Sequence, residues 1–344
     1  SVNLKSFVNR KFQKNTEFNF SRFSKTVAMA MRLSDDLVEL EIEKLDNIIS
    51  CCDTSDEKTL WKRLRTACVN GRRTGLGTHG LAYDSDEAIQ VIDKIYETLK
   101  ITAYTESVRL SEERGSFPVF NWEKEKDNEF IKLLPPELQL LIAQHGRRNI
   151  SILTNAPTGS VSIMSQTSSG IEPVFRNSYT RRRKLSHNEK HVEADFIDDL
   201  GDRWSEYKVF HHNIKQYLEL MGTDEVPDFF TESDQIDWEN RVHIQAAIQK
   251  HIDHSISSTI NLPKDTSPEV VGTLYQLGWK LGLKGITVYV DGSRSGVLIS
   301  EDNKNVFPQN TATVRPTELP CDIHHTTIQG EKWIILVGLL DGKP

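Results

Sequence analysis

The stretch 149–184, NISILTNAPTGSVSIMSQTSSGIEPVFRNSYTRRRK, decides the fold of this chain. It opens with an apolar, β-favouring segment at 150–154 and then turns at a Pro/Gly pair into residues crowded with small hydroxyl side chains. A strand that ends in such a turn and leads into a helix start presents several backbone N–H groups together, which suits a phosphate. The hydroxyls of Thr158, Ser160 and Ser162 add donors. From these residues alone, a phosphate loop and a plain strand–turn–helix connection stay equally open.

Chain length, charge and cysteine spacing limit the class of protein. The 344 residues are enough for one large α/β domain or two ordinary ones. With 42 basic and 49 acidic side chains, bulk electrostatic binding of nucleic acid or of an anionic membrane surface is not expected. No apolar run approaches a membrane span, and the first residues carry no signal pattern. The cysteines form no Cys-x-x-Cys pair, so a reducing, cytoplasmic setting fits best. They are Cys51, Cys52, Cys68 and Cys321.

Apolar residues at helical spacing predict long helices before residue 149. Asn19 or Ser21 is the expected cap of the first helix, and Ser85 that of the third. Asn70 and Gly71 are expected to end the second. The helices are predicted over residues 23–49, 57–69, 84–114 and 135–145.

Short β-branched strands alternate with helices in the rest of the chain. A helix at 267–283 separates the last two strands, and strand–helix–strand of this kind is typical of a parallel crossover. Residues 300–317 are polar and contain two prolines, which predicts a linker, and residues 322–340 predict a small β-rich appendage. The strands are predicted at 150–154, 257–262 and 285–290.

Residues 75–80, GLGTHG, match the Gly-x-Gly-x-x-Gly spacing of dinucleotide sites. That motif needs a strand directly before it, whereas the preceding residues, LWKRLRTACVNGRR, predict an amphipathic basic helix. The glycines are therefore interpreted as positions of close backbone packing. A nicotinamide-dependent dehydrogenase is the weakest of three functional hypotheses, and a lack of saturable NAD binding would remove it.

Three groups of residues have metal-like spacing but lack further ligands at helpful positions. Solvated or hydrogen-bonded histidines are the favoured interpretation, so no metal site is predicted. The basic run at 181–184 is interpreted as a solvated turn because the overall field is acidic, with attraction of a polyphosphate as the alternative. The three groups are His187 with His191, His251 with His254, and Cys321 with His324 and His325.

Five motifs carry a resemblance to a known family. They are RRTGLGTHGLA at 72–82, YDSDEA at 83–88, HGRRNISILTNAPTGSVSIMSQTSSGIEPVF at 145–175, DHSISSTINLP at 253–263 and KGITVYVDGSRSGVL at 284–298. In this order they resemble the ribonucleotide reductase large chain, most closely its class II, adenosylcobalamin-dependent type. That family folds as a ten-stranded α/β barrel of two parallel halves. The resemblance implies that residues 1–299 form the second half of the barrel, 300–317 a linker and 318–344 the start of a small β-rich C-terminal region.

The resemblance also assigns a site and a cofactor. The loop that holds the substrate's phosphates in the family matches Pro157, Thr158, Gly159, Ser160 and Val161. Diiron-type members carry two adjacent tyrosines for a radical relay at a position where this chain has a single one, Tyr289 after a valine. The resemblance therefore implies adenosylcobalamin, the vitamin B12 coenzyme, as the source of a locally made radical.

The resemblance implies an enzyme part, the C-terminal portion of a reductase that replaces the ribose 2′-OH of a ribonucleoside di- or triphosphate with hydrogen. The family's radical cysteine, on an Asn-x-Cys-x-Glu strand, and its redox cysteine pair lie upstream of Ser1, so no catalytic residue is predicted in this chain. The implied partners are the ribonucleotide, the N-terminal half, a thioredoxin-type reductant and a second copy in a homodimer of the full enzyme. Neither nucleic acid nor a membrane is an expected partner.

The alternative hypothesis is a catalytically inert nucleotide-binding or structural half of a split or degenerate reductase. Between Ala82 and Tyr83 the family usually has about ten more residues, two to three helical turns. This shortening and the absence of the family's cysteines favour the alternative. Adding an upstream polypeptide with the Asn-x-Cys-x-Glu strand would separate the two hypotheses, because only the first expects adenosylcobalamin-dependent turnover.

Overall fold

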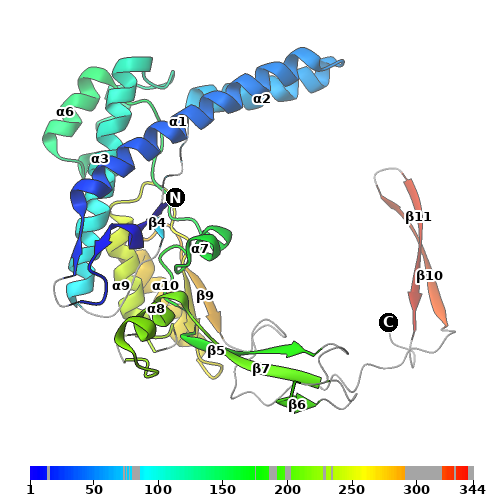
Figure 1. The fold of residues 1–344 in the computed structure, drawn as a ribbon. Coiled ribbons are helices and arrows are strands. Elements are labelled where there is room, and N and C mark those ends of the chain that lie inside the picture. Colours follow the sequence, from blue (N-terminus) through cyan, green and yellow to red (C-terminus); the bar gives the residue numbers. More distant parts are fainter. Residues whose placement is uncertain are drawn as a thin grey trace. The chain divides into compact units, whose positions relative to one another are not determined.

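The computed structural model describes residues 1–13, 16–72, 74, 76, 78–79, 86–174, 176–185, 192–197, 203–227, 230–233, 235–290, 320–328 and 331–339. The chain divides into two compact units (Figure 1). The first is Ser1–Tyr179 with Lys208–Val297, and the second is Thr180–Tyr207 with Leu298–Pro344. The first unit contains the loop at 157–161.

Helices make up most of the first unit, and every helix predicted from the sequence is confirmed with bounds that shift by up to three residues. Asn19 caps the first helix, since its Oδ1 accepts a hydrogen bond from Arg22 N at 2.9 Å. Arg72, in the left-handed region with φ 42°, follows the second helix instead of the predicted stop at Asn70 and Gly71. None of the described helices is long and apolar enough to cross a membrane. The helices are α1 (Phe20–Cys51), α2 (Ser55–Gly71), α3 (Asp86–Arg114), α4 (Trp122–Glu125), α5 (Glu129–Lys132), α6 (Pro136–His145), α7 (Gly159–Ser165), α8 (His212–Met221), α9 (Trp238–Gln249) and α10 (Pro268–Lys280), with a 3-10 turn η1 at Leu4–Phe7.

Parallel segments run through the first unit, beginning at the N-terminus. β1 (Val2–Asn3) pairs in parallel with β4 (Thr78–His79). Just before β4, Leu76 is bridged in parallel to Leu153. Leu76 N donates to Ile152 O at 3.0 Å and Leu76 O accepts from Thr154 N at 3.1 Å. The predicted strand at 150–154 is therefore present as a short ladder beside the segment that leads into β4.

The same segment has a parallel neighbour on its other side. Leu153 O accepts from His254 N at 3.0 Å, and Asn155 O accepts from Ser257 N at 2.9 Å. The chain then continues into β8 (Thr259–Leu262), which pairs in parallel with β9 (Thr287–Val290). The parallel crossover predicted for this part of the sequence, strand–helix–strand through α10, is confirmed.

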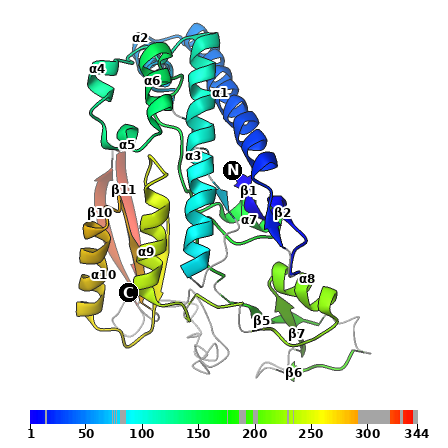
Figure 2. The ribbon, with the colours of Figure 1, turned by 90° about the vertical axis from the view of Figure 1, so that its left-hand side faces the viewer.

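The parallel segments are neighbours in space in the order in which they follow in the chain: β1, β4, residues 152–155, β8 and β9. Helical connections join them, and among the described residues the two end strands, β1 and β9, each pair on one side only. A one-directional strip of this kind is what half of a ten-stranded α/β barrel requires. Figure 2 shows α3 lying between α1 and α9, and α3 contacts both of these helices.

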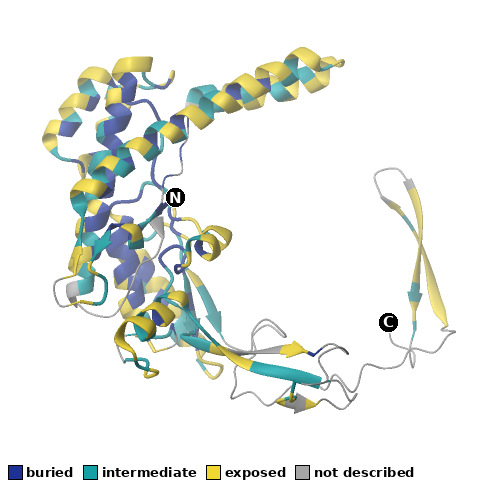
Figure 3. Cartoon of the chain, viewed as in Figure 1, coloured by how far each residue is buried: buried dark blue, intermediate teal, exposed yellow. Residues whose placement is uncertain are grey.

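Two apolar cores fix the helices to the strip. The larger one joins α1, α3 and α9 to the strand residues Ile152 and Leu153, and the buried residues appear as a dark band in Figure 3. The smaller one packs Leu274 of α10 and Val242 of α9 against β8 and β9. Each fully buried aliphatic or aromatic side chain contributes about 1.5–3 kcal/mol. Packing on one side of the strip therefore holds it in place.

A small antiparallel ribbon follows η1, formed by β2 (Val8–Asn9) and β3 (Glu17–Phe18). In the second unit, β5 (Ser178–Lys184), which starts at the end of the first, belongs to a sheet of order β5-β7-β6 with β7 (Arg203–Phe210) and β6 (Phe196–Ile197). The predicted β-rich appendage is present as an antiparallel hairpin. Its strands are β10 (Cys321–Ile328) and β11 (Glu331–Gly338). The predicted linker at 300–317 lies outside the described residues, and the boundary at 299 stays a prediction.

Candidate functional site

The strand that leads into the loop is held at its first residues by a side chain from a distant segment. Asp253 accepts hydrogen bonds from Ile152 N at 2.8 Å and Leu153 N at 2.7 Å. The same carboxylate accepts a bond from the Tyr104 hydroxyl at 2.8 Å, and burial raises the pKa of that phenol well above its usual value. Ile152 and Leu153 are both fully buried, so without Asp253 their amides would have no acceptor.

Carbonyl groups at the start of the same strand are satisfied by Arg147. Its Nη1 donates to Asn149 O and Ile150 O, both at 2.6 Å, and its Nη2 pairs with Glu125 at 2.6 Å. The guanidinium also stacks on Phe117, 5.2 Å from the ring centroid. Charge-assisted bonds of this kind contribute about 1.5–3 kcal/mol each.

Asn149 connects the strand to α1 and α3. Its side-chain amide donates to Asp35 Oδ1 at 3.0 Å and to Arg72 O at 3.1 Å. Its Oδ1 accepts from the Ser107 hydroxyl at 3.0 Å. Asn149, Asp35 and Ser107 are fully buried, so these bonds form in a region with little competing water.

The loop begins after Asn155, and Thr158 sets its shape. Thr158 lies in the left-handed region with φ 54° and ψ 31°, which is rare for a β-branched residue. Its Oγ1 accepts from Gly170 N at 2.8 Å. Gly170 itself has φ 49°, and a Cβ there would stand 3.0 Å from Ala156 O. The hydrogen bond from Gly170, which follows α7 in the chain, therefore holds the turn at Thr158, which precedes α7.

Among the described residues, three consecutive amides at the start of α7 lack acceptors. Helix α7 begins at Gly159, and its first internal bond to the turn is Ser162 N to Thr158 O at 2.8 Å. In the part of the chain that the structure describes, no acceptor lies within bonding distance of the amides of Gly159, Ser160 and Val161. All three residues are exposed, and the space where a Gly159 Cβ would stand is open for 4 Å. These amides are accessible donors, which is the geometry that a phosphate requires.

The hydroxyl groups around the loop divide into two sets. Ser162, counted as a donor from the sequence, is buried and donates to Gly159 O at 2.7 Å, so it closes the turn and faces no ligand. Ser160 is exposed and its hydroxyl has no partner among the described residues. The helical twist separates the two, because residues two apart point to nearly opposite sides. Pro157 is exposed and Thr158 half-buried beside this surface.

Basic groups lie near the other end of α7. Lys5 Nζ donates to Gln166 O at 3.4 Å. Burial and the neighbouring Lys11 lower the pKa of Lys5. Burial, His212 and Lys5 lower the pKa of His211 to about 4. None of these residues was indicated by a motif, because the β1–η1 and α8 segments that bring them together lie far apart in the sequence.

The glycine-rich segment at 75–80 has a different role from a nucleotide turn. Its described residues, Leu76, Thr78 and His79, lie in the strip next to Leu153 and β1. The helix α2 precedes it, as predicted from the basic amphipathic pattern. The segment is thus a barrel strand, and the strand–turn–helix of a dinucleotide fold is not formed by the residues described.

The histidine pairs have ordinary surroundings where they are described. His251 Nε2 lies 2.9 Å from Asp93 Oδ1, and Gln249 donates to His254 O at 2.9 Å. Among the described residues, no three His, Cys, Asp or Glu side chains come close enough to hold a metal ion. His187, His191 and the junction of Ala82 with Tyr83 lie outside the described residues, and the basic run at 181–184 lies on β5.

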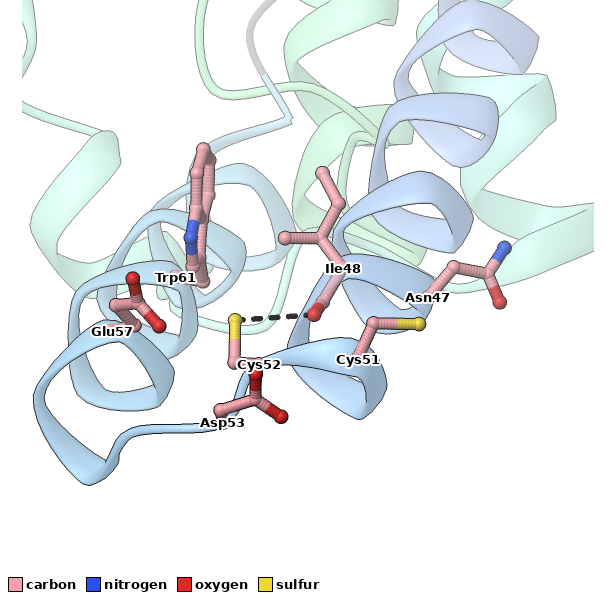
Figure 4. Close-up of a pocket in the computed structure, with 7 residues that line it drawn as sticks. All are labelled: Asn47, Ile48, Cys51, Cys52, Asp53, Glu57 and Trp61. Carbon is pink, nitrogen blue, oxygen red and sulfur yellow. Dashed lines mark hydrogen bonds between the residues drawn. The ribbon is translucent and has the colours of Figure 1, made fainter.

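A shallow hollow at the turn between α1 and α2 is separate in sequence from the loop (Figure 4). Cys51 is exposed there, and Cys52 Sγ donates to Ile48 O at 3.2 Å. The two thiols point away from each other, and Trp61 stands across from them. All four cysteines are unpaired. The hollow is lined by Asn47, Ile48, Cys51, Cys52, Asp53, Glu57 and Trp61.

Residues 1–289 match the family model described as the ribonucleotide reductase barrel domain. The chain belongs to the ribonucleotide reductase family. It is 27% identical over 322 residues to the vitamin B12-dependent ribonucleoside-diphosphate reductase of Mycobacterium tuberculosis, covering 87% of this chain and 40% of that protein. It is 26% identical over 314 residues to the protein of the same name from Thermoplasma acidophilum, covering 86% and 35%. The family predicted from the five motifs is therefore confirmed.

Other relatives are reductases without B12 in their names. The chain is 27% identical over 306 residues to the ribonucleoside-diphosphate reductase large subunit of Plasmodium falciparum, covering 80% of this chain and 35% of that protein. The class Id ribonucleotide reductase alpha subunit of Actinobacillus ureae has the same fold, with a TM-score of 0.54 at 19% identity over 84% of this chain and 48% of that one. The predicted barrel-half fold is confirmed, and the chain spans about two-fifths or less of the length of these curated relatives.

Proposed function

We propose that this chain supplies the substrate-phosphate site and half of the barrel wall of a ribonucleotide reductase. In this proposal the diphosphate or triphosphate of a ribonucleotide binds at Pro157, Thr158, Gly159, Ser160 and Val161. The observation that carries the proposal is the group of three adjacent amides at Gly159–Val161, on exposed residues and without an acceptor in the described part of the chain, which follow a strand of the reductase barrel.

The amides are the main source of affinity in this site. Helix α7 has only seven residues, so its dipole adds little, about 0.3–1 kcal/mol. Hydrogen bonds from neutral donors to an anion contribute about 1.5–3 kcal/mol each. Three amides and the Ser160 hydroxyl can therefore hold and orient the phosphates. We refer to residues 157–161 as the phosphate cradle, and the hydrogen bonds that hold residues 149–153 keep it in place.

The family reaction replaces the ribose 2′-OH with hydrogen, and this chain's part in it is to hold and orient the substrate. Adenosylcobalamin, suggested by the names of two relatives, supplies homolysis and a radical when bound. The hollow at the α1–α2 turn is open to solvent, and its lining combines the apolar Ile48 and Trp61 with two thiols, an amide and two carboxylates. A shallow, solvent-open hollow of this kind does not fit a corrin. We expect the cofactor and the radical and redox cysteines to be held by an N-terminal half of the enzyme.

Exposed apolar side chains next to the amides support a partner at this surface. Ile163 and Met164 of α7 are 76% and 86% exposed, although they stand on a barrel helix. Surfaces of this kind are usually covered in the assembled protein. The N-terminal half is the partner proposed here, with a thioredoxin-type reductant and a homodimer of the full enzyme as further partners of the whole.

Substitution of Ser160 by aspartate tests the site. Ser160→Asp places a carboxylate among the three amides, so it should compete with the phosphates and weaken binding of a ribonucleoside diphosphate at least tenfold in calorimetric titration. The matched control is Ser55→Asp, at the first residue of α2, which should leave affinity unchanged. Equal affinity in Ser160→Asp and wild type, with both folded by circular dichroism, would remove the assignment.

Reconstitution separates an enzyme part from an inert module. The chain is mixed with an upstream polypeptide that carries the Asn-x-Cys-x-Glu strand, a reductant and adenosylcobalamin. Deoxyribonucleotide formation that needs both polypeptides and the cofactor supports the proposed function. Nucleotide binding without turnover supports the inert half instead.

A further inference from the structure

Four basic side chains from η1, from the segment after β2 and from the start of α8 lie close to one another. We refer to Lys5, Lys11, His211 and His212 as the basic cluster. Its contact with α7 is at the C-terminal end of that helix, whereas the phosphate cradle lies at the N-terminal end. The seven residues of α7 span about 10 Å at about 1.5 Å per residue, so the two groups of donors are separate.

Lys5 is anchored at the residue that ends α7. Its Nζ donates to Gln166 O at 3.4 Å, and its side chain is half-buried. An ammonium group has three N–H donors, so this bond leaves two of them available within the described structure. Lys11 lies close enough that its charge, together with burial, lowers the pKa of Lys5. Two ammonium groups are therefore held near each other, and none of the described carboxylates forms an ion pair with Lys5.

The segment that carries Lys11 is fixed against α8. Arg10 and Phe12, on either side of Lys11, have left-handed backbone angles, φ 50° and φ 62°. That conformation is uncommon outside glycine and persists where surrounding contacts hold it. The Phe12 ring packs edge-on against Tyr217 of α8, with 5.5 Å between the ring centroids. The Thr16 hydroxyl donates to Arg10 O at 2.7 Å and closes the turn. The position of Lys11 is therefore set by its neighbours on both sides.

His211 and His212 add imidazole groups at the start of α8, with 6.3 Å between their ring centroids. Nδ1 of His211 accepts a hydrogen bond from Asn213 N at 3.4 Å. The proton of the neutral ring is therefore on Nε2, which is a donor. Burial, His212 and Lys5 lower the pKa of His211 to about 4. The positive charge of the basic cluster at pH 7 consequently comes from its two lysines.

Two carboxylates beside the basic cluster already have partners. Glu17 pairs with Arg10 at 3.4 Å. Glu232 pairs with Arg176 at 2.7 Å and also accepts a hydrogen bond from Asn177 N at 2.7 Å. The charge of the two lysines is therefore not neutralised by the residues that the structure describes. Such a concentration of one sign of charge raises the local concentration of anions.

We propose that the basic cluster binds a phosphate dianion at a site separate from the phosphate cradle. The donors are the ammonium groups of Lys5 and Lys11 and the Nε2–H group of His211. Phosphate carries about two negative charges at neutral pH and has three strong acceptor oxygens, so it can accept from all three donors and neutralise both lysines. A carboxylate has a single charge and would leave one lysine uncompensated. Free inorganic phosphate and the phosphate of a second nucleotide present the same dianion.

The histidine ring resonances measure this binding directly. In the whole chain with isotope-labelled histidine, saturating inorganic phosphate at constant ionic strength should raise the pKa of His211 by about one unit, because a nearby anion favours the protonated ring. Chloride at the same ionic strength controls for screening. His211→Asn and His212→Asn assign the resonances. A ribonucleoside diphosphate that half-saturates the shift at a lower concentration than inorganic phosphate identifies a nucleotide as the ligand, and the reverse order identifies the free ion.

Variants separate the basic cluster from the phosphate cradle. Lys11→Gln removes one charge and should weaken phosphate binding at the basic cluster at least fivefold without changing the circular dichroism spectrum. The matched control is Lys62→Gln on α2, an exposed lysine, which should have no effect. Ser160→Asp, which blocks the phosphate cradle, should leave the response of His211 to inorganic phosphate unchanged. The test is therefore independent of whether the substrate binds at the phosphate cradle.

Three results would overturn the proposal. The first is a pKa of His211 that responds to neither inorganic phosphate nor the nucleotide. The second is an equal response in Lys11→Gln and in the wild-type chain. The third is loss of the response in Ser160→Asp, which would show that the anion binds in the phosphate cradle and acts on His211 from there.

Discussion

Residues 149–153 and the start of α7 are close in the sequence but differ in how their backbone N–H and C=O groups are hydrogen-bonded. In residues 149–153, side chains from elsewhere in the fold bind the amides and carbonyls that the parallel ladder leaves over, through Asp253 and Arg147. A few residues later, the amides of Gly159, Ser160 and Val161 have no described acceptor. The contrast indicates that backbone N–H donors can remain without partners in a loop when the strand that leads into it is held firmly by hydrogen bonds.

The largest expected effect on the free energy of unfolding comes from removing the side chain that holds residues 152 and 153. Asp253→Ala leaves the buried amides of Ile152 and Leu153 without acceptors and removes the partner of the Tyr104 hydroxyl. At about 1–3 kcal/mol for each unsatisfied buried group, the free energy of unfolding should fall by about 3–5 kcal/mol. Urea unfolding measures this change.

Two variants control for this effect. Asp265→Ala, in an exposed turn, should change stability by less than about 0.5 kcal/mol. Asp253→Asn keeps one acceptor oxygen and should fall between wild type and Asp253→Ala. If Asp253→Ala were as stable as Asp265→Ala, the strand would be held by its ladder and core contacts alone.

A smaller effect concerns the pH dependence of stability at His211, the N-cap residue of α8. The pKa of His211 is lowered from 6.5 to about 4 by burial, His212 and Lys5, so between these two values the unfolded state binds more protons than the folded state. The stability that His211 contributes is therefore fully present above its unfolded-state pKa of 6.5, and it is lost as the pH falls toward about 4. Allowing for partial exposure to solvent, the loss due to this group is about 1–2 kcal/mol.

His211→Asn should flatten that part of the stability curve. His211 Nδ1 accepts from Asn213 N at 3.4 Å at the start of α8, and asparagine keeps an acceptor there. Unfolding at about pH 8 should be nearly the same in both proteins, while at about pH 4.5 the variant should be the more stable. Parallel curves for the two proteins would show that the acid sensitivity arises at other groups.

The smallest expected change in stability is at Thr158. Glycine accepts the left-handed conformation without strain, which favours Thr158→Gly by about 1–2 kcal/mol. The lost bond from Gly170 N and the freer unfolded chain offset this gain, so stability should change by less than about 1 kcal/mol. Nucleotide affinity should nevertheless fall several-fold, because the loop is no longer fastened at Gly170.

Thr158→Asn sharpens that measurement. Asparagine tolerates the left-handed region and keeps a side-chain acceptor, so affinity in titration should stay within about twofold of wild type. A loss as large as in Thr158→Gly would assign the effect to the threonine side chain itself rather than to the fastening of the turn.

The sequence predicted what depends on local pattern. The long helices, the strands at 150–154, 257–262 and 285–290, and the turn at Pro157 are all visible as periodicity, caps and breakers. Helix α9 was not predicted, because it is buried nearly all round and carries Arg241, Gln245 and Gln249 among its buried residues, so it has no polar face.

The part of the site that was not predicted consists of contacts between distant residues. Nothing in the sequence indicates that Asp253 bonds to amides one hundred residues earlier. The inward direction of Ser162 and the outward direction of Ser160 also follow from where the helix begins, which sequence patterns fix only to within a few residues. The five resemblance motifs predicted the family, but the assignment of phosphate to the loop still depends on the proposed titration.

The order of the parallel strip has a consequence for assembly. The segment that feeds the phosphate cradle is the third in the series β1, β4, 152–155, β8 and β9, so two strands insulate it from each unpaired margin of the described strip. At about 4.8 Å per strand, any seam with a complementary half would run about 10 Å away on both sides. Joining the halves would then enclose the cradle without reshaping it, and a defective seam should lower turnover well before it lowers nucleotide affinity.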